Sequence, residues 1–467
     1  MTNQPNLATA GDLRESGYKP VSVREEMRRN LIEALRNGTP VFKSIRGYDN
    51  TVLPQIYNAI LAGQDIIMLG ERGQAKTRIA RELTRLLDPF TPIITGSETN
   101  DDPLNPVSAY GKAQVAEFGD RTPISWLPRD RRFSEKLATP DTTVADLIGE
   151  VDPIKVAEGR YLNNEEIISY GLIPRTNRGI FNLNELPDLA ERIQVGLLNI
   201  LEEQDIQIRG FQVRLPLDLM VIASANPEDY TNRGRIITPL KDRFGSQIRT
   251  HYPVTTELEL EIAEQERTRA DIPGVKVTIP DYMREIIAEI SHVARRSPDV
   301  SQRSGVSVRM TVANLESLVA NAQRRALLTG EESAAPRISD LNAIYPTTLG
   351  KIELESLGES RDEAIVDRIV GDAIRHVFGR TVDPSRLDAI LLAFDNGLTI
   401  DVSDQAKNFD YVHQVSSIDG FGDLISSLGA GRDPATMAAA IEFVIEGLYR
   451  NRKLSRRVSR AGHSYQR

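Results

Sequence analysis

Hydrophobic positions follow two different patterns along the chain. In the first half, short apolar runs predict buried β-strands at 65–69, 91–95, 179–184 and 219–224. Amphipathic stretches with helical spacing, such as 188–203, lie between these runs. Residues 206–214 alternate apolar and polar side chains on both sides of Gly210, which predicts a β-hairpin. Strands that alternate with helices are typical of a mostly parallel sheet with both faces covered.

The second half of the chain shows mainly the helical pattern. After about residue 254 the strand signal fades, and amphipathic helices are predicted at 256–270, 281–297, 309–328 and 360–378. In the first half, a stretch at about 97–140 is rich in proline and charge and is expected to be irregular. The pattern therefore predicts an α/β domain followed by a helical region.

The stretch GERGQAKTR, residues 70–78, stands between the strand at 65–69 and the helix that follows. It matches the phosphate-binding pattern G-x-x-x-x-G-K-[ST], except that Ala75 replaces the second glycine. Such a loop points backbone N–H groups at anionic oxygens, where the helix dipole is positive. Lys76 would then reach the β- and γ-phosphates, and Thr77 would ligate magnesium. The alternative is a plain turn from strand to helix.

Ala75 is the one departure from the phosphate-binding pattern, so its conformation affects whether the loop can bind phosphate. An alanine costs little if its φ angle stays negative, and about 1 kcal/mol if the position needs the left-handed region. Gly73 supplies conformational freedom nearby. The candidate nucleotide-binding residues of the loop are Gly70, Glu71, Arg72, Gly73, Gln74, Ala75, Lys76, Thr77 and Arg78.

Two further strands end in polar residues. The strand at 179–184 ends in Asn184 and is followed by Glu185, where hydrolytic NTPases usually carry Asp-Glu. Glu185 is the candidate general base, and the Asn184 amide oxygen can accept a hydrogen bond from a magnesium-bound water but brings no charge. Asn226 follows the strand at 219–224 and is suited to orient the attacking water. The alternatives are a helix-cap carboxylate for Glu185 and a turn-forming Asn-Pro for Asn226.

Two arginines are candidates for contacts with the γ-phosphate. Arg243, in LKDRF, is suited to stabilise the charge of a transition state in a neighbouring subunit. Its alternative is a surface ion pair with Asp242. Arg309, in SVR, opens a helix of the second half and could reach the same phosphates from a lid.

Composition narrows the class of protein. The absence of cysteine excludes disulfides, zinc–thiolate sites and thiol catalysis, and it fits a cytoplasmic location. The five histidines are scattered without ligand spacing, so no histidine metal site is expected. The formal net charge of −9 makes nucleic acid an unlikely partner, although two basic clusters exist. They comprise Arg129, Arg131 and Arg132, and the tail residues Arg450, Arg452, Lys453, Arg456, Arg457 and Arg460.

The order of these motifs resembles that of the AAA+ ATPases, and within them the MoxR and magnesium-chelatase I-subunit (helix-2-insert) branch. GERGQAKT is similar to the variant Walker A loop of that branch, alanine included, and GIFNLNELPDL is similar to its Walker B strand. SANPED, LKDRFG and SGVSVR resemble sensor 1, the arginine finger and sensor 2, which implies these roles for Asn226, Arg243 and Arg309. FKSIRG resembles the segment that packs on the adenine and adds Ile45 and Gly47.

The resemblance implies a fold, cofactors and partners. The expected fold class is α/β, with an AAA+ P-loop parallel sheet, a helical lid and a mostly helical C-terminal extension. ATP and Mg²⁺ are the implied cofactors, with Thr77, Asn184 and Glu185 at the metal. A homo-oligomeric ring is implied, most often a hexamer, in which Arg243 acts on the neighbouring subunit's nucleotide. The implied partner is a von Willebrand factor A domain protein.

The resemblance covers roughly residues 40–330 and sets the expected boundaries. They are an N-terminal segment with one helix at 1–40, an α/β nucleotide-binding domain at 41–253, a helical lid at 254–345 and a C-terminal extension with a basic tail at 346–467. The stretch at 97–140 would hold the branch's helix-2 insert, and 206–214 its pre-sensor hairpin.

Four functions remain open at this point. The leading one is an ATP-hydrolysing ring that remodels or activates a partner protein, a chaperone-like activity, because Lys76, Thr77, Glu185 and Arg243 occur together. A second is the motor subunit of a metal chelatase. A third is a nucleotide-gated scaffold with little hydrolysis, which Ala75 and Asn184 favour. A DNA-acting motor is the fourth, and the acidity of the chain argues against it.

Overall fold

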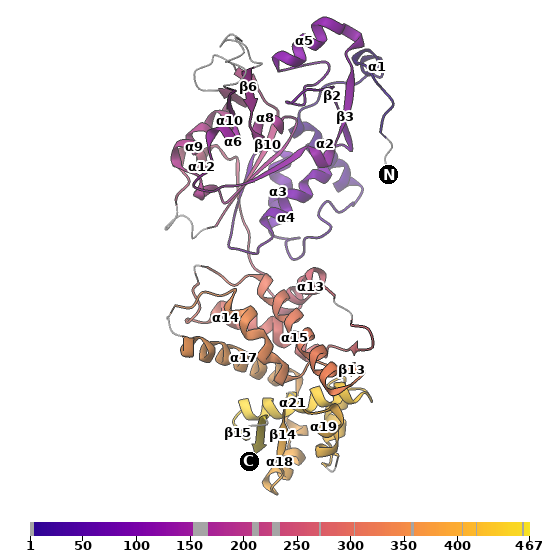
Figure 1. The fold of residues 1–467 in the computed structure, drawn as a ribbon, viewed down its shortest axis with the longest axis vertical. Coiled ribbons are helices and arrows are strands. Elements are labelled where there is room, and N and C mark those ends of the chain that lie inside the picture. Colours follow the sequence, from indigo (N-terminus) through magenta and orange to yellow (C-terminus); the bar gives the residue numbers. More distant parts are fainter. Residues whose placement is uncertain are drawn as a thin grey trace. The chain divides into compact units, whose positions relative to one another are not determined.

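In the computed structural model of the protein, the chain divides into two compact units, residues 1–251 and 252–467. The structure describes residues 4–152, 167–207, 214–226, 234–269, 272–302, 304–355, 359–403, 405–416, 418–459 and 462–467. Within these ranges, none of the helices combines the length and the apolar character that a membrane crossing requires. Colours run from indigo to magenta through the first unit and from orange to yellow through the second (Figure 1).

The first unit is built on a parallel five-stranded sheet. Its strand order is β11-β1-β10-β7-β4, and all four neighbouring pairs run parallel. The strands are β1 Ile66–Leu69, β4 Phe133–Leu137, β7 Gly179–Asn184, β10 Leu219–Ala225 and β11 Ser246–Arg249. Because β1, β7 and β10 are buried on both faces, they form near-continuous apolar runs, which the sequence pattern predicted.

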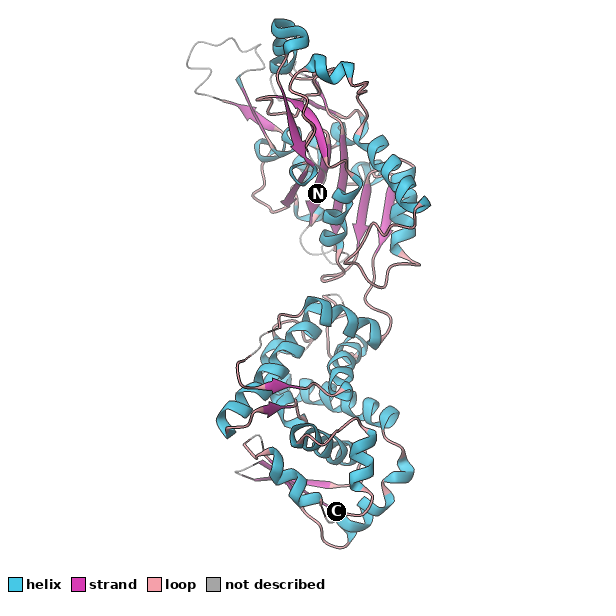
Figure 2. Cartoon of the chain, turned by 90° about the vertical axis from the view of Figure 1, so that its right-hand side faces the viewer, coloured by secondary structure: helices cyan, strands magenta, loops and turns pink. Residues whose placement is uncertain are grey.

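Helices cover both faces of this sheet (Figure 2). Side chains alternate along each strand, so Ile66 and Met68 join one core while Ile67 and Leu69 join the other. The first core contains α2 Val23–Arg36, α3 Val52–Leu61 and α4 Lys76–Glu82. The second contains α9 Glu191–Gly196, α10 Leu198–Glu202, α12 Thr238–Arg243 and the hairpin of β8 Asp205–Gln207 and β9 Arg214–Pro216. The predicted α/β class is confirmed.

The stretch 97–140 is not irregular, which corrects the expectation from its composition. It contains α5 Ala109–Phe118, strand β3 Ile124–Pro128, which pairs antiparallel with β2 Phe90–Ile94, and strand β4 of the main sheet. Strand β4 lies at the sheet edge and pairs only with β7 among the described strands. An edge strand tolerates polar and charged residues, so Phe133-Ser-Glu-Lys-Leu137 lacks the apolar run by which a central strand is recognised.

Shorter elements complete the first unit. Its described helices and 3₁₀ turns also include α1 Ala10–Glu15, η1 Leu83–Leu86, η2 Gly119–Arg121, η3 Arg129–Arg131, α6 Val144–Leu147, α8 Leu172–Arg175 and η5 Leu186–Asp188. Strands β5 Gly149–Val151 and β6 Ile168–Tyr170 form a further antiparallel pair. The tip of the predicted hairpin at 206–214 lies outside the described residues.

The second unit is mainly helical, as the pattern predicted. Its longer helices are α13 Thr256–Glu266, α14 Asp281–Arg296, α15 Val308–Thr329, α17 Glu359–Thr381 and α21 Pro434–Arg450. Shorter elements are β12 Lys276–Val277, β13 Ser333–Ala334, η6 Ile338–Ile344, α16 Tyr345–Leu349, η7 Pro384–Arg386, α18 Asp388–Asp395, α19 Asn408–Val415 and α20 Phe421–Ser427. A three-stranded antiparallel sheet joins β14 Ile400–Val402, β16 Gly462–Gln466 and β15 Ser455–Ser459.

One hydrophobic core runs through this unit from α13 to β16. At its centre the ring of Phe443, on α21, stacks on Tyr282 of α14 at a centroid distance of 4.3 Å and meets Phe378 of α17 edge-on at 5.7 Å. Residues on both sides of position 345 contribute to the core. The predicted boundary between a lid and a C-terminal extension falls inside this unit and stays a prediction.

Candidate functional site

The phosphate-loop candidate follows the carboxyl end of β1. Residues 70–75 leave the sheet at Leu69, and α4 begins at Lys76. Gly70 donates its N–H to the carbonyl of Ala225 at the end of β10 (3.1 Å), and a Cβ at Gly70 would approach Thr250 Oγ1 to 1.9 Å. A larger residue there would displace the side chains of Thr250 and Gln74. Gly73 and Ala75 both have positive φ angles, +76° and +58°.

Lys76 is held over this loop. Its side chain is buried, and its Nζ donates to the backbone carbonyls of Gly70 and of Glu71, the latter at 2.9 Å. Gln74 is also buried and accepts a hydrogen bond from Thr250 Oγ1 at 2.6 Å, which ties the loop to the end of β11. Glu71, Arg78 and Gly73 are half-buried, and Arg72 is exposed. A lysine ammonium and backbone amides at a helix start are the groups that bind phosphate.

Asn184 lies at the centre of a hydrogen-bond network beside α4. Its Oδ1 accepts from Thr77 Oγ1 (3.3 Å), Asn182 Nδ2 (3.2 Å) and Ser224 Oγ (3.2 Å). Its Nδ2 donates to Glu135 Oε1 on β4 at 2.7 Å. Side chains from three strands and from α4 therefore form hydrogen bonds with one buried amide. Of the residues in this network, the sequence had placed only Thr77 and Asn184 together, at the metal.

Glu185 and Asn226 follow the ends of β7 and β10. Glu185 has a left-handed backbone (φ +54°), is half-buried, and donates its N–H to Ser224 Oγ at 3.4 Å. Asn226 is 1% exposed, and its Oδ1 has no hydrogen-bond partner among the described residues. Buried acceptors are usually hydrogen-bonded in folded proteins, and the residues that follow Asn226 lie outside the described ranges. The rest of the SANPED motif, 227–229, lies outside the described residues.

The segment with Ile45 and Gly47 packs against the end of α4. The Glu82 carboxylate on α4 accepts from the backbone N–H groups of Lys43 (2.8 Å) and Ser44 (3.3 Å), and Ile45 is buried in the core beneath. Gly47 has a φ of +78°, a conformation that favours glycine. Tyr48, missed in the sequence, donates its hydroxyl to the carbonyls of Gln74 (3.0 Å) and His251 (2.7 Å). Burial raises the pKa of that hydroxyl well above its usual range.

The two arginine candidates belong to other elements, α12 and α15. Arg243 is the last residue of α12. It forms an ion pair with Glu202 of α10 at 2.5 Å, and not with Asp242, the partner that the sequence suggested. Its Nε donates to the same carboxylate at 2.7 Å. Arg309 belongs to the second unit, where it is exposed in the first turn of α15.

Three arginines of the basic clusters form ion pairs within the chain. Arg132 is 1% exposed and binds Glu26 through both terminal nitrogens, at 2.7 and 2.5 Å. Arg450 and Arg456 of the tail both contact the Glu446 carboxylate. These arginines are therefore not part of an open basic surface.

The donor set beside the loop fits a magnesium–nucleotide complex. Mg²⁺ in nucleotide sites keeps several waters and is bound through one or two carboxylates together with substrate phosphates. Thr77 Oγ1 and Asn184 Oδ1 supply neutral oxygens here, and Glu135 and Glu185 supply carboxylates next to Asn184. Within the described ranges, no three acidic or histidine side chains gather closely enough to cage a metal ion by themselves.

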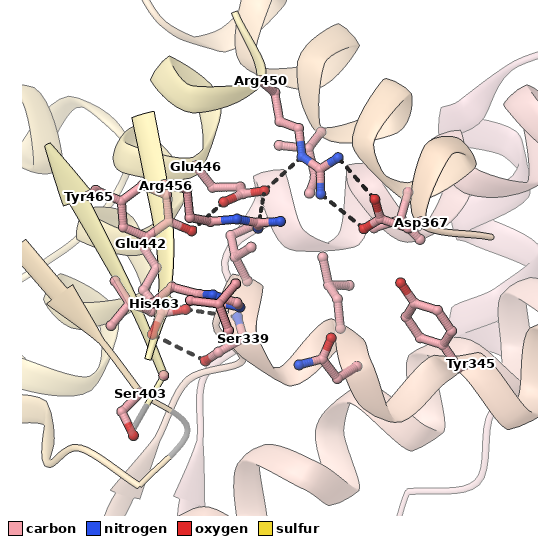
Figure 3. Close-up of a pocket in the computed structure, with 18 of the residues that line it drawn as sticks. Ser339, Tyr345, Asp367, Ser403, Glu442, Glu446, Arg450, Arg456, His463 and Tyr465 are labelled. Carbon is pink, nitrogen blue, oxygen red and sulfur yellow. Dashed lines mark hydrogen bonds and ion pairs between the residues drawn. The ribbon is translucent and has the colours of Figure 1, made fainter. Parts of the chain in front are cut away.

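A cavity of about 430 Å³ lies in the second unit (Figure 3). Its charged residues mainly pair with one another: Arg450 donates to Glu446 (2.7 Å) and Asp367 (3.1 Å), and Arg456 donates to Glu446 (3.4 Å). Burial raises the pKa of Glu442 in its wall. Because these charges are satisfied internally and none of the sequence candidates lines the cavity, the candidate site is the carboxyl edge of β1, β10 and β7.

Comparison with known proteins gives one family match. Residues 124–244, which include β4, β7, Asn226 and Arg243, match the AAA domain of the dynein-related subfamily, and this confirms the predicted kind of domain. The uncharacterized protein YeaC of Bacillus subtilis is 27% identical over 182 residues, covering 36% of this chain and 54% of that protein. The chain thus spans about half the length of the curated relative it matches.

Solved structures with some likeness include NtrX from Brucella abortus in complex with ADP. It is 16% identical, covers 78% of this chain and 66% of that chain, and has a TM-score of 0.37. A chain from the complex between subunits BchI and BchD of magnesium chelatase is 19% identical, covers 69% of this chain and 98% of that chain, and has a TM-score of 0.35. At TM-scores below 0.5, neither likeness bears on the function of the chain.

Proposed function

Since this chain carries a AAA domain, we propose that it is an ATPase that assembles into a ring and uses ATP hydrolysis to remodel a partner protein. The observation that carries the proposal is the convergence of Lys76, Thr77, Asn184, Glu185 and Asn226 at the carboxyl ends of three neighbouring parallel strands. Ligands of open parallel sheets bind at this edge.

Each residue has a role that its position supports. The loop amides and the Lys76 ammonium bind the β- and γ-phosphates, and Thr77 and Asn184 orient their oxygens toward the metal. Bound Mg²⁺ would neutralise charge that develops on the phosphate oxygens. Glu185 accepts the proton of the attacking water, and the Oδ1 of Asn226, which has no partner among the described residues, accepts a hydrogen bond from that water.

The ring and its partner belong to this proposal. Arg243 sits at the end of α12 with its side chain only partly buried, so a rotation away from Glu202 presents its guanidinium to a neighbouring subunit. There it would stabilise transition-state charge on the neighbour's γ-phosphate, within a homo-oligomer for which we propose six subunits. The proposed partner is a von Willebrand factor A domain protein in the cytoplasm.

A second candidate is a scaffold that binds ATP and hydrolyses it very slowly. Asn184 favours it, because an amide at this position brings no charge to the metal. Steady-state hydrolysis across a range of protein concentrations separates the two. We expect turnover per subunit to rise with concentration as shared sites form, and Glu185→Gln to lower it at least about a hundredfold while ATP still binds.

Glu203→Gln is the matched control. Glu203 is an exposed glutamate outside the site, and its variant should hydrolyse ATP like the wild type. Tight ATP binding with equally low turnover in wild type and Glu185→Gln, at every concentration, would favour the scaffold. Absence of any nucleotide binding would contradict both candidates.

A further inference from the structure

The position of Asn184 raises a question about charge. Its side chain is an amide at the place where hydrolytic NTPases usually carry a carboxylate, yet it occupies the centre of the network beside Thr77. A carboxylate does lie next to this amide. It belongs to Glu135 of β4, whose Oε1 accepts the hydrogen bond from Asn184 Nδ2 at 2.7 Å.

Glu135 determines which way the amide faces. An ionised carboxylate only accepts hydrogen bonds, so the NH₂ end of Asn184 must point toward Glu135 and the oxygen must point away from it. The oxygen accepts hydrogen bonds from the donors Thr77 Oγ1, Asn182 Nδ2 and Ser224 Oγ. Of these donors, Thr77 belongs to the first turn of α4, where the phosphates are proposed to bind.

Glu135 is itself held in place from two sides. Strand β4 pairs with β7 so that Glu135 lies opposite Asn182 and Leu137 lies opposite Asn184. Arg81 of α4 donates to both carboxylate oxygens of Glu135, at 2.8 and 3.2 Å. Since α4 begins at Lys76, this bidentate pair connects Glu135 directly to the helix that carries the phosphate loop.

We propose that Glu135 is a positioning residue of the magnesium–nucleotide site: it orients the Asn184 amide from the neighbouring strand, while Arg81 holds the Glu135 carboxylate in place. This inference rests on the proposed function, and it deepens it by naming a residue that no motif of the sequence contains. Glu135 acts through Asn184, and it touches no reacting atom in this arrangement.

If Glu135 orients Asn184, then position 184 requires an amide and an aspartate there should function less well. Restoring aspartate there would place two carboxylates where a 2.7 Å hydrogen bond now joins amide and carboxylate. Like charges at that distance repel, or they hold one proton between them, so the new aspartate would not face the metal as a free carboxylate. Asn184→Asp should therefore weaken the binding of Mg²⁺ with the nucleotide. Adding Glu135→Gln should restore this binding, because the carboxylate then stands at position 184 and the amide at position 135.

The test compares wild type, Glu135→Gln, Asn184→Asp and the double variant, each with Glu185→Gln to prevent turnover. The readout is the Mg²⁺ concentration that gives half-maximal binding of a fluorescent ATP analogue, and thermal unfolding without nucleotide checks the fold. We expect both single changes to raise this concentration about tenfold and the double variant to lie within about threefold of wild type. Glu117→Gln, at an exposed glutamate of α5, is the control and should match wild type.

Each outcome is informative. Single variants that bind like wild type, or a double variant in which the two effects simply add, would overturn the role of Glu135 while leaving nucleotide binding established. If no variant binds the analogue, the wild type included, the proposed function fails and this inference with it. Should Glu135→Gln unfold, Glu135→Asp replaces it: the shorter carboxylate keeps the charge but loses reach to Asn184, and wild-type magnesium dependence would again contradict the proposal.

Discussion

Ala75 has a left-handed backbone (φ +58°, ψ 14°) at the residue before α4. This conformation costs an alanine about 1 kcal/mol relative to glycine, which accepts it freely. Part of that difference is offset because glycine loses more conformational entropy on folding. We expect Ala75→Gly to raise the free energy of unfolding of the first unit by about 0.5–1 kcal/mol, measured by urea denaturation.

Ala113 provides a control in which the same substitution should change stability in the opposite direction. Ala113 is exposed inside α5 of the same unit, so Ala113→Gly should lower the free energy of unfolding by about 0.5–1 kcal/mol. A loss of stability of similar size in both variants would contradict the strain at Ala75. The sequence identified this position as the departure from the phosphate-loop pattern, but only the backbone angle shows that the departure is strained.

Individual residues of the candidate site were predictable to different degrees. Lys76, Thr77, Asn184 and Glu185 stand out because each occurs beside a recognisable strand end or in a short motif. Glu135 and Tyr48 were missed because their contacts join segments distant in the sequence, and no motif contains them. Ser224 begins the SANPED motif but was not singled out, because its hydrogen bond to Asn184 joins two different strands. The roles of all these residues stay predictions, whereas their proximity is an observation.

Among the elements, a buried ion pair fastens α2 to the turn before β4. Arg132 and Glu26 are 1% and 5% exposed, and Arg132 also donates to the Arg178 carbonyl at 2.7 Å. Removing one partner of such a pair leaves an uncompensated buried charge, which typically costs about 3–5 kcal/mol. We expect Arg132→Met to lower the free energy of unfolding of the first unit by that amount in urea denaturation.

Replacing both partners provides the control. The double variant Arg132→Met with Glu26→Leu buries no charge, so it should recover most of the loss. A single variant within about 0.5 kcal/mol of wild type would mean that the pair contributes little. Equal losses in single and double variants would instead assign the effect to packing and to the bond with the Arg178 carbonyl.

Buried strands and long amphipathic helices were predicted from the sequence more accurately than exposed, short strands. Strands β7 and β10 and the helices α14 and α15 were predicted within about two residues, because a central strand or a long amphipathic helix has a strong pattern. Strand β4 and the hairpin of β15 and β16 were missed. Both are short and carry arginine, lysine or glutamate, since β4 lies at a sheet edge and β15 pairs only with β16 among the described strands.

At the scale of the whole molecule, each of the two units has its own apolar core. The helices and strands of residues 1–251 close two cores around the parallel sheet, and residues 252–467 share one extended core. Units with separate cores can unfold in separate steps, and a ligand stabilises only the unit that it contacts. Calorimetry can therefore report which unit binds the nucleotide.

Stabilisation by a bound nucleotide can also test Arg309, the candidate phosphate-binding arginine of the second unit. A ligand at a hundred times its dissociation constant stabilises the unit it contacts by about 2.7 kcal/mol. With Mg²⁺ and ATP in the Glu185→Gln background, we expect the unfolding temperature of the first unit to rise, because that unit carries the phosphate-loop candidate. If the sensor 2 role that the resemblance implies for Arg309 holds, the second unit rises as well, and Arg309→Ala abolishes that second rise while keeping the first. Arg324→Ala, at an exposed arginine farther along the same helix, should leave both rises unchanged. If the second unit shows no rise in wild type, Arg309 does not contact the nucleotide, and the loop alone accounts for binding.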